Sequence, residues 1–152
     1  MKQPPAVRPI HASSFIPDHS VDVAAGLIFR EGKLLIAQRP LTGHLPGVWE
    51  FPGGKRHSGE SFEECLRREL REELGVEVEV GERLLSLDHD YPERRVHLEF
   101  FCCRLASDHS KPEAIGCPAL AWVKADELES YAFPAADARL LERLKKDLAL
   151  WR

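Results

Sequence analysis

Three glutamates in the middle of the chain, Glu69, Glu72 and Glu73, have the residue type and spacing that could carry chemistry. Residues 61–74 show the apolar period of an amphipathic helix, which turns about 100° per residue. The apolar side of this helix would carry Phe62, Cys65, Leu66, Leu70 and Leu74. Because the three glutamates overlap the same sector, we expect their carboxylates to point toward the protein. Like charges held together in a partly dry site repel one another, and a bound cation relieves that repulsion.

A hard divalent ion fits these acids better than a soft metal would. Magnesium takes oxygen ligands, keeps several waters and is often completed by substrate phosphates, which suits carboxylates with no His or Cys among them. The alternative is an ordinary surface helix rich in acids. That alternative explains neither the inward placement of the glutamates nor the glycines that frame the segment, Gly54 and Gly75.

Local signals predict where this helix begins and ends. Ser61 and Glu64 have the spacing of a capping box, and Gly75 suits the left-handed residue that ends a helix. Before the helix, residues 49–51 favour a short strand and residues 52–54 a turn, whose glycines permit backbone angles closed to other residues. The side of the helix expected to face water carries Glu63, Glu64, Arg67, Arg68 and Arg71.

The preceding residues predict a β-hairpin. Residues 21–30 and 33–38 are rich in strand-forming residues, and Glu31 and Gly32 between them suit a tight turn. Arg39 follows the second strand where it opens onto a loop over residues 41–47. Two interpretations of Arg39 are open: a contact to phosphate, or a solvated arginine at a strand end.

The remaining segments predict a mixed α and β fold. We expect strands within residues 76–87, 96–105 and 119–123, with a break at Gly81 and a turn at residues 91–94. A short acidic helix at residues 125–131 and a longer one at 134–151 follow. Strands with helices before and after them indicate an α+β protein, built as an α/β/α sandwich.

Length and composition indicate one domain, at residues 20–152, preceded by a loosely ordered arm at residues 1–19 that contains four prolines. The net charge of −4 and the pI near 6.0 give no electrostatic reason to expect a nucleic acid or membrane partner. The four cysteines form no C-x-x-C pair, which favours buried thiols in a reducing compartment. We therefore expect a cytoplasmic protein.

Gly54, Glu60 and residues 68–76 together match the Nudix box, GX5EX7REUXEEXGU with U aliphatic, at every fixed position. On these residues the chain is identified as a member of the Nudix hydrolase superfamily. It further resembles the MutT branch and the related CTP pyrophosphohydrolase group, through the segments AAGLIF, LLIAQRP, WEFPGGK, DYPERR and FPAADARLLERL. The resemblance implies the Nudix fold, an α/β/α sandwich with a mixed central sheet in which the box forms a loop, a helix and a loop.

The resemblance also implies an activity. MutT-like enzymes use magnesium, or manganese, to hydrolyse a nucleoside triphosphate to a monophosphate and pyrophosphate, here of the oxidised purine or cytidine type. The catalytic residues it implies are Glu69, Glu72 and Glu73. Glu72, Glu73 and the carbonyl of Gly54 would bind the metal, and Glu69 would either bind it or act as general base. The resemblance implies structural roles for Glu60 and Arg68 and a water-mediated metal contact for Glu50.

Substrate contacts follow from the same resemblance. Arg39 matches an arginine that contacts phosphate, and Phe51, Tyr91 and Arg94 match residues around the base. Asp137 stands where MutT itself has an asparagine and where the CTP pyrophosphohydrolase group has an aspartate. A carboxylate only accepts hydrogen bonds, so Asp137 could accept from the cytosine amino group or from guanine N1–H and N2–H. Its other interpretation is an acid favoured by the helix dipole.

One departure concerns a further acid. Relatives often carry a carboxylate six residues before the tryptophan of the last strand, and here that position, counted from Trp122, is Gly116. Glu113 is the nearest acid in this loop and the candidate to replace it. Without that acid, the role of base rests more heavily on Glu69.

Other functions and assemblies stay open at this point. A Nudix hydrolase for nucleoside diphosphate sugars, dinucleotides or NADH is the second enzyme hypothesis, and a non-catalytic nucleotide-binding module is the third. The partner expected in every case is a small-molecule nucleotide. The protein could be a monomer or a homodimer.

Overall fold

The computed structural model describes residues 20–152, and the arm expected over residues 1–19 lies outside them. Strands β1 (Ser20–Arg30) and β2 (Lys33–Gln38) form the predicted hairpin, with Arg30 paired to Lys33. Glu31 and Gly32 both have positive φ, 54° and 78°. Two left-handed residues in succession give a turn whose twist matches that of the flanking strands.

The central sheet has seven strands and is mixed. β5 (Val78–Tyr91) and β6 (Arg94–Leu105) form a long antiparallel hairpin, and β6 runs parallel to β1. The path through the sheet is β3-β2-β1-β6-β5, where β3 is Trp49–Glu50. β4 (Gly53–Lys55) pairs with β1, and β7 (Leu120–Val123) pairs with β2.

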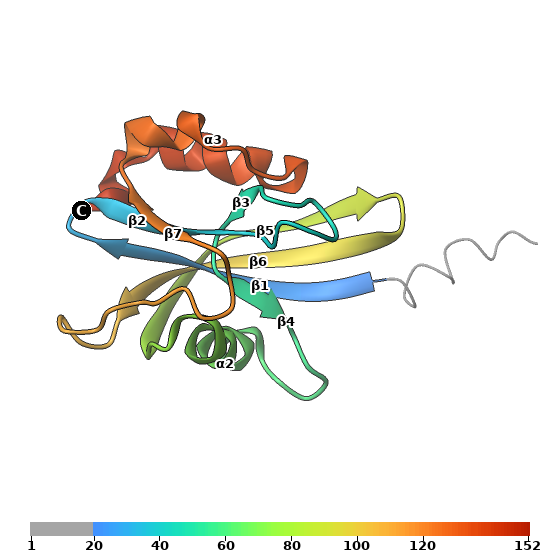
Figure 1. Ribbon diagram of the computed structural model, residues 1–152, viewed down its shortest axis with the longest axis horizontal. Coiled ribbons are helices and arrows are strands. Elements are labelled where there is room, and N and C mark those ends of the chain that lie inside the picture. The colour runs from blue at the N-terminus through green and yellow to red at the C-terminus, as the bar shows by residue number, and fades with distance from the viewer. Residues whose placement is uncertain (1–19) are drawn as a thin grey trace, which may run out of the picture.

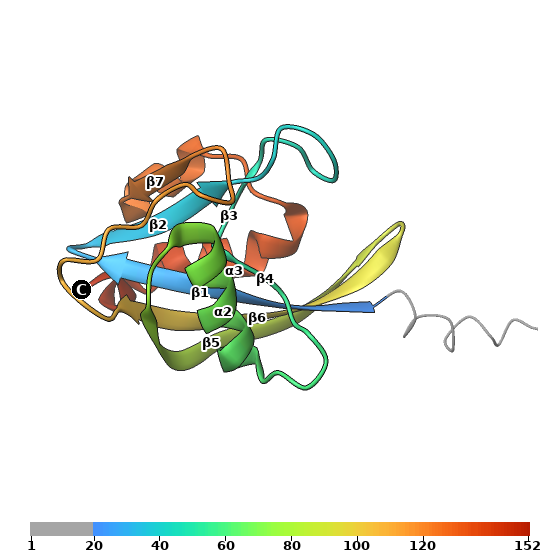
Figure 2. The ribbon, with the colours of Figure 1, turned by 60° about the horizontal axis from the view of Figure 1, so that its bottom comes forward.

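Helices cover both faces of this sheet, as Figures 1 and 2 show. Helix α2 (Phe62–Leu74) packs on one face, and α3 (Ala138–Lys146) lies over the other. Three short 3-10 helices accompany α3: η2 (Ala125–Ser130), η3 (Ala135–Asp137) and η4 (Leu148–Trp151). Because side chains alternate along β1, Ala24 enters the core under α2 while Ala25 enters the core under α3. The predicted α/β/α sandwich is confirmed.

Two predicted elements differ in extent. Strand β5 does not break at Gly81 but continues to Tyr91, with irregular pairing between Val80 and Leu85. A bulge of this kind absorbs the glycine without ending the strand. The single helix expected over residues 134–151 divides into three parts. Helix α3 ends at Lys146, and Asp147 after it has φ and ψ of −97° and 78°, which are not helical.

The turn predicted at residues 52–54 is wrong, because Gly53 and Gly54 belong to strand β4. Neither glycine has a positive φ. A Cβ atom on Gly53 would lie 1.9 Å from the carbonyl oxygen of Ala24 on the paired strand β1. A glycine is therefore required at position 53 because the two strand backbones approach closely there. Its backbone angles alone would not require one.

No helix within residues 20–152 is both long and apolar enough to cross a membrane.

Candidate active site

Helix α2 begins and ends at the residues that the sequence predicts. The Ser61 hydroxyl accepts from the Glu64 N–H at 3.0 Å, and the Glu64 carboxylate accepts from the Ser61 N–H at 2.8 Å. At the other end Gly75 is left-handed, with φ of 68°, and its N–H donates to the Arg71 carbonyl. Both ends of the helix that carries the three glutamates are thus fixed by local hydrogen bonds.

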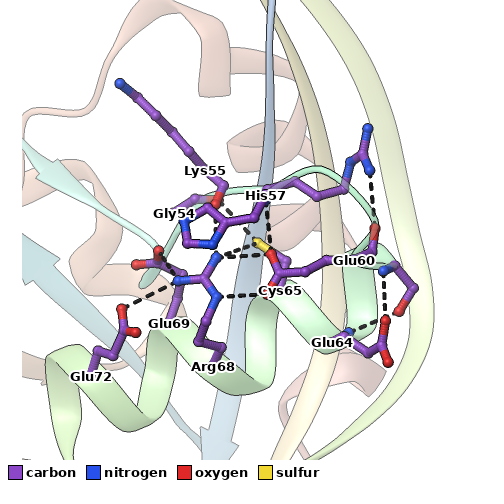
Figure 3. Close-up of polar contacts among 11 residues, drawn as sticks. Gly54, Lys55, His57, Glu60, Glu64, Cys65, Arg68, Glu69 and Glu72 are labelled. Carbon is purple, nitrogen blue, oxygen red and sulfur yellow. Dashed lines mark hydrogen bonds and ion pairs between the residues drawn. The ribbon is translucent and has the colours of Figure 1, made fainter.

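Arg68 lies at the centre of a network that joins the helix to the preceding loop (Figure 3). Its guanidinium donates to both oxygens of Glu60, at 2.6 and 2.9 Å, and to the Lys55 carbonyl at 3.0 Å. The two bonds from Arg68 to Glu60, with a third from the His57 N–H, lower the pKa of Glu60 to about 2. The solvated position predicted for Arg68 is wrong, since its side chain is only 19% exposed. Arg68 and Glu60 hold loop and helix together, as the resemblance implied.

Glu69 points inward, as predicted, and its side chain is 14% exposed. Arg68 donates to it at 2.8 Å. A Cβ atom on Gly54 would lie 2.3 Å from the Glu69 carboxyl carbon. The absence of a side chain at Gly54 therefore gives Glu69 its space beside strand β4.

Glu72 does not follow the predicted orientation. Its side chain is 59% exposed and accepts from Arg68 at 3.2 Å. The helical angle put it at the edge of the apolar sector, and there it pairs with an arginine one turn earlier on the same helix. The prediction that all three glutamates point inward is therefore wrong for Glu72.

Glu73 is half-buried, and its surroundings perturb its carboxyl group. Burial raises its pKa to about 8, with further contributions from the charges of Glu69, Glu50 and Glu72. The loop before β7 packs closely against Glu73, since a Cβ atom on Gly116 would lie 3.1 Å from the Glu73 Cγ atom. Glu73 therefore lies where negative charge is costly and where a cation would be favoured.

A cleft of about 550 Å³ gathers most of the predicted site residues. Its lining includes Gly54, Glu69, Glu73, Arg39, Phe51, Tyr91, Arg94 and Asp137. Two predicted candidates, Glu72 and Glu113, do not line it. Glu113 is exposed, and its N–H donates to the Leu74 carbonyl at the end of α2, whereas Gly116 of the same loop does line the cleft.

Asp137 lies at the junction of η3 and α3 and is only 6% exposed. It occupies the N-cap position of α3, but its side chain makes no capping hydrogen bond. Burial raises its pKa to about 7, and the negative charge of Glu50 adds to the shift. The helix-dipole interpretation does not explain a carboxyl group that lines the cleft without capping the helix.

Tyr91 and Arg94 flank the tip of the β5–β6 hairpin and bring it to the cleft. Burial raises the pKa of Tyr91, and the charge of Asp137 contributes. The Arg94 Nε atom is buried and has no hydrogen-bond partner within residues 20–152. A buried donor without an acceptor is costly, and a ligand oxygen or ring nitrogen would satisfy it.

Phe51 is buried, at 4% exposure, and its ring stacks on Phe133 at 5.2 Å between centroids. It also meets Phe100 edge-on at 6.2 Å. One ring face is thus already covered, so this side chain forms part of the apolar wall of the cleft.

Sequence reasoning missed some of the cleft residues. His44 lines the cleft from the loop after β2, and its ring packs edge-on against Tyr91 at 5.0 Å. Cys117 and an apolar floor from β6, with Val96 and Leu98, also line it. A loop histidine and alternating strand residues carry no local signal for a site, because only the packing of the hairpin places them there.

The donor groups suit a divalent metal ion. Glu69, Glu73 and Gly54 line the same cleft and offer only oxygen ligands, and the Gly54 carbonyl accepts from the Cys65 thiol at 3.5 Å. Burial of the Glu73 carboxyl group would make a cation beside it favourable. Within residues 20–152, however, no three His, Cys, Asp or Glu side chains converge as they stand. Arg68 holds two of the glutamates, Glu69 and Glu72, so these carboxylates would have to turn toward a metal.

Comparisons with known proteins point to one family. The NUDIX domain model matches residues 24–143. A CTP pyrophosphohydrolase of Escherichia coli (strain K12) is 40% identical over 122 residues, which are 80% of this chain and 89% of the relative. An 8-oxo-dGTP diphosphatase of Proteus vulgaris is 46% identical over 80 residues, 52% of this chain and 71% of the relative.

A solved structure agrees with the sequence relatives. The solution structure of the E. coli ORF135 protein has a TM-score of 0.69 at 40% identity, over 81% of this chain and 86% of that chain. The residues matched by the domain model run from β1 to α3 and contain the whole loop–helix–loop from Gly54 to Val76. The chain therefore belongs to the Nudix family.

Proposed function

We propose that this protein is a Nudix hydrolase that splits a nucleoside triphosphate into a nucleoside monophosphate and pyrophosphate. Support comes from relatives named CTP pyrophosphohydrolase and 8-oxo-dGTP diphosphatase. The single observation that carries the proposal is one cleft lined by two acids of the box, Glu69 and Glu73, by Arg39, and by the buried Asp137. Such a cleft offers groups for metal, phosphate and base.

The Glu50 carboxylate acts on two of these groups. The charge of Glu50 raises the pKa of Glu73, and it also raises the pKa of Asp137. Arg39 is the ion-pair partner of Glu50. In this proposal the phosphate chain binds at Arg39, the metal at the box acids and the base beside Asp137.

The metal is Mg²⁺ in this proposal, with Mn²⁺ as a substitute, held by Glu69, Glu72, Glu73 and the Gly54 carbonyl. Nudix hydrolases generally need a divalent metal, which neutralises phosphate charge and lowers the pKa of bound water. In this proposal Glu69, which lines the cleft, either binds the metal or accepts a proton from the attacking water. Glu73 is the group that most needs the cation.

The base is a cytosine or an oxidised purine, bound by Asp137 with Tyr91, Arg94 and Phe51 around it. As a carboxylate, Asp137 accepts from an exocyclic amino group, and as a carboxylic acid it also donates to a carbonyl. A pKa of about 7 makes both forms available near neutral pH. This fits relatives named for both kinds of nucleotide.

The proposed partner is a free nucleotide in the cytoplasm, and the proposed role is the removal of unwanted triphosphates from the nucleotide pool. The net charge of −4 favours a local cationic contact such as Arg39 over binding to a long polyanion. The enzyme would act as a monomer or a homodimer.

A pyrophosphate-release screen over common, methylated and oxidised nucleoside triphosphates, with Mg²⁺, tests the proposal. We expect pyrophosphate and a monophosphate as products, and a loss of at least about 100-fold in kcat in Glu73→Ala and Glu72→Ala. Glu63→Ala, on the exposed side of the same helix, is the matched control and should keep its activity. Full turnover in both Glu72 and Glu73 variants, or two monophosphates or a sugar phosphate as products, would contradict the proposal.

A further inference from the structure

Arg39, the residue proposed to contact phosphate, already has an anionic partner. Its Nη1 atom donates to the Glu50 carboxylate at 3.0 Å, and its Nε atom donates to the His44 carbonyl at 3.1 Å. The Arg39 and Glu50 side chains are 27% and 30% exposed, and both line the cleft. The ion pair therefore lies in the cleft in which the proposed substrate would bind.

The backbone holds both members of this pair in place. Gln38 pairs with Trp49 and Ala37 pairs with Glu50 across the β2–β3 ladder, and the Arg39 N–H donates to the Val48 carbonyl at 2.8 Å. The two side chains thus project from adjacent, hydrogen-bonded strand ends. Paired backbone therefore keeps the two residues side by side, and Arg39 can change partner by rotating its side chain alone.

Glu50 is in an unfavourable place for a carboxylate. Burial raises its pKa even though Arg39 opposes the shift, and its charge acts on Glu73 and on Asp137. Arg39 is the cation that offsets this burial. A phosphate chain carries more negative charge than a single carboxylate and matches the guanidinium fork, so it can compete for the same donors.

We propose that Glu50 is a positioning residue that occupies Arg39 in place of a phosphate group and releases it when the phosphate chain of the substrate enters. The polyphosphate class of this ligand rests on the proposed function. Binding is then an exchange of partners: Arg39 turns from Glu50 to phosphate. When the product leaves, Glu50 takes Arg39 back, which lowers the affinity of the cleft for phosphate-bearing products.

A double-mutant cycle on Arg39 and Glu50 tests this exchange. Inorganic tripolyphosphate is titrated calorimetrically into the full chain in the presence of EDTA, for wild type, Glu50→Gln, Arg39→Gln and the double variant. We expect Glu50→Gln to tighten binding about tenfold, because Arg39 no longer has to leave a charged partner. In the Arg39→Gln background the same Glu50 change should alter the affinity by less than about twofold.

Two results would overturn the proposal. A gain from Glu50→Gln that persists in the Arg39→Gln background would mean that the carboxylate acts only through the general charge of the cleft. No gain in Glu50→Gln, including no detectable binding by either wild type or this variant, would mean that freeing Arg39 creates no phosphate affinity. The pyrophosphate-release screen judges the proposed function separately, since its outcome depends on the box glutamates and not on this cycle.

Two variants control for structure. Glu50→Asp keeps the charge and should show no tightening, which separates charge from packing. Glu129→Gln removes an ion pair with Lys145, at 2.9 Å, that does not line the cleft, and it should leave tripolyphosphate affinity unchanged. Thermal unfolding of each variant without ligand confirms that all are folded at the temperature of the titration.

Discussion

Individual carboxyl groups in the cleft show how burial and charge act on single residues. Asp137 is 6% exposed, the charge of another acid, Glu50, adds to its shift, and within residues 20–152 it forms no ion pair. Glu60, by contrast, has the paired guanidinium of Arg68, and its pKa falls to about 2. The same chemical group is therefore costly at Asp137 and favourable at Glu60, because only one of them has a cationic partner.

This contrast gives a pH-dependent prediction for Asp137. In the unfolded chain an aspartate loses its proton near pH 4, whereas folded Asp137 keeps it up to about pH 7. Between these values the folded state binds more protons, so the free energy of unfolding falls as pH rises, and the loss is complete above about pH 7. Asp137→Asn removes this titration and should be more stable than wild type by roughly 2–4 kcal/mol at pH 8, but not at pH 4.

Urea unfolding at pH 4, 6 and 8 measures this difference. Asp108→Asn, an exposed aspartate in the loop after β6, is the control and should show no such dependence on pH. A constant difference between Asp137→Asn and wild type at all three pH values would show that the carboxyl group is not protonated in the folded state.

Strand β4 shows how one short element serves both fold and site. Gly53 faces the backbone of β1, where a Cβ atom would lie 1.9 Å from the Ala24 oxygen and 2.8 Å from the Ala25 Cα atom. Gly54 faces the end of a side chain, the Glu69 carboxyl group, at 2.3 Å. The first obstacle is paired backbone and the second can rotate away.

We therefore predict different consequences for the two alanine variants. Gly53→Ala must separate β4 from β1 and should destabilise the protein by about 3 kcal/mol or prevent folding. Gly54→Ala should cost no more than about 1 kcal/mol, because Glu69 can turn aside, yet it should lower kcat by at least about tenfold. Urea unfolding and steady-state kinetics distinguish the two, and equal stability losses would contradict this account of β4.

At the scale of the whole molecule, the C-terminal residues close the core on the α3 face. Trp151 is 5% exposed, its indole N–H donates to the Leu144 carbonyl at 2.9 Å, and its ring meets Phe29 edge-on at 5.4 Å. The last turn of the chain thus packs against β1, close to the hairpin with which the described fold begins. Figure 1 shows the C-terminus beside that hairpin.

Trp151→Ala should lower the free energy of unfolding by about 3–5 kcal/mol, because it leaves a large cavity and an unpaired carbonyl. Leu148→Ala, in the same 3-10 helix but with 57% of the residue exposed, should cost less than about 1 kcal/mol. Urea unfolding monitored by far-UV circular dichroism measures both. Similar losses in the two variants would show that η4 contributes no specific packing to the core.

Local patterns predicted the elements well where neighbouring residues decide them. The capping box of Ser61, the stop at Gly75 and the turn at Glu31 and Gly32 depend on residues a few positions apart, and the structure contains each of them. The break at Asp147 and the continuation of β5 past Gly81 were missed. In both cases packing against other elements outweighs the local preference.

The sequence by itself determined the family, the amphipathic helix with its glutamates and the expectation of a hard cation, because spacing along one helix is a local property. Tertiary structure alone decided that Glu72 faces Arg68 and solvent, that Gly53 is needed for close approach, and that Arg39 pairs with Glu50. These outcomes depend on contacts between residues separated in the sequence or on competition for one guanidinium. The position of a residue on a helix specifies the direction of its side chain. The packing of strands and loops decides which residue that side chain contacts.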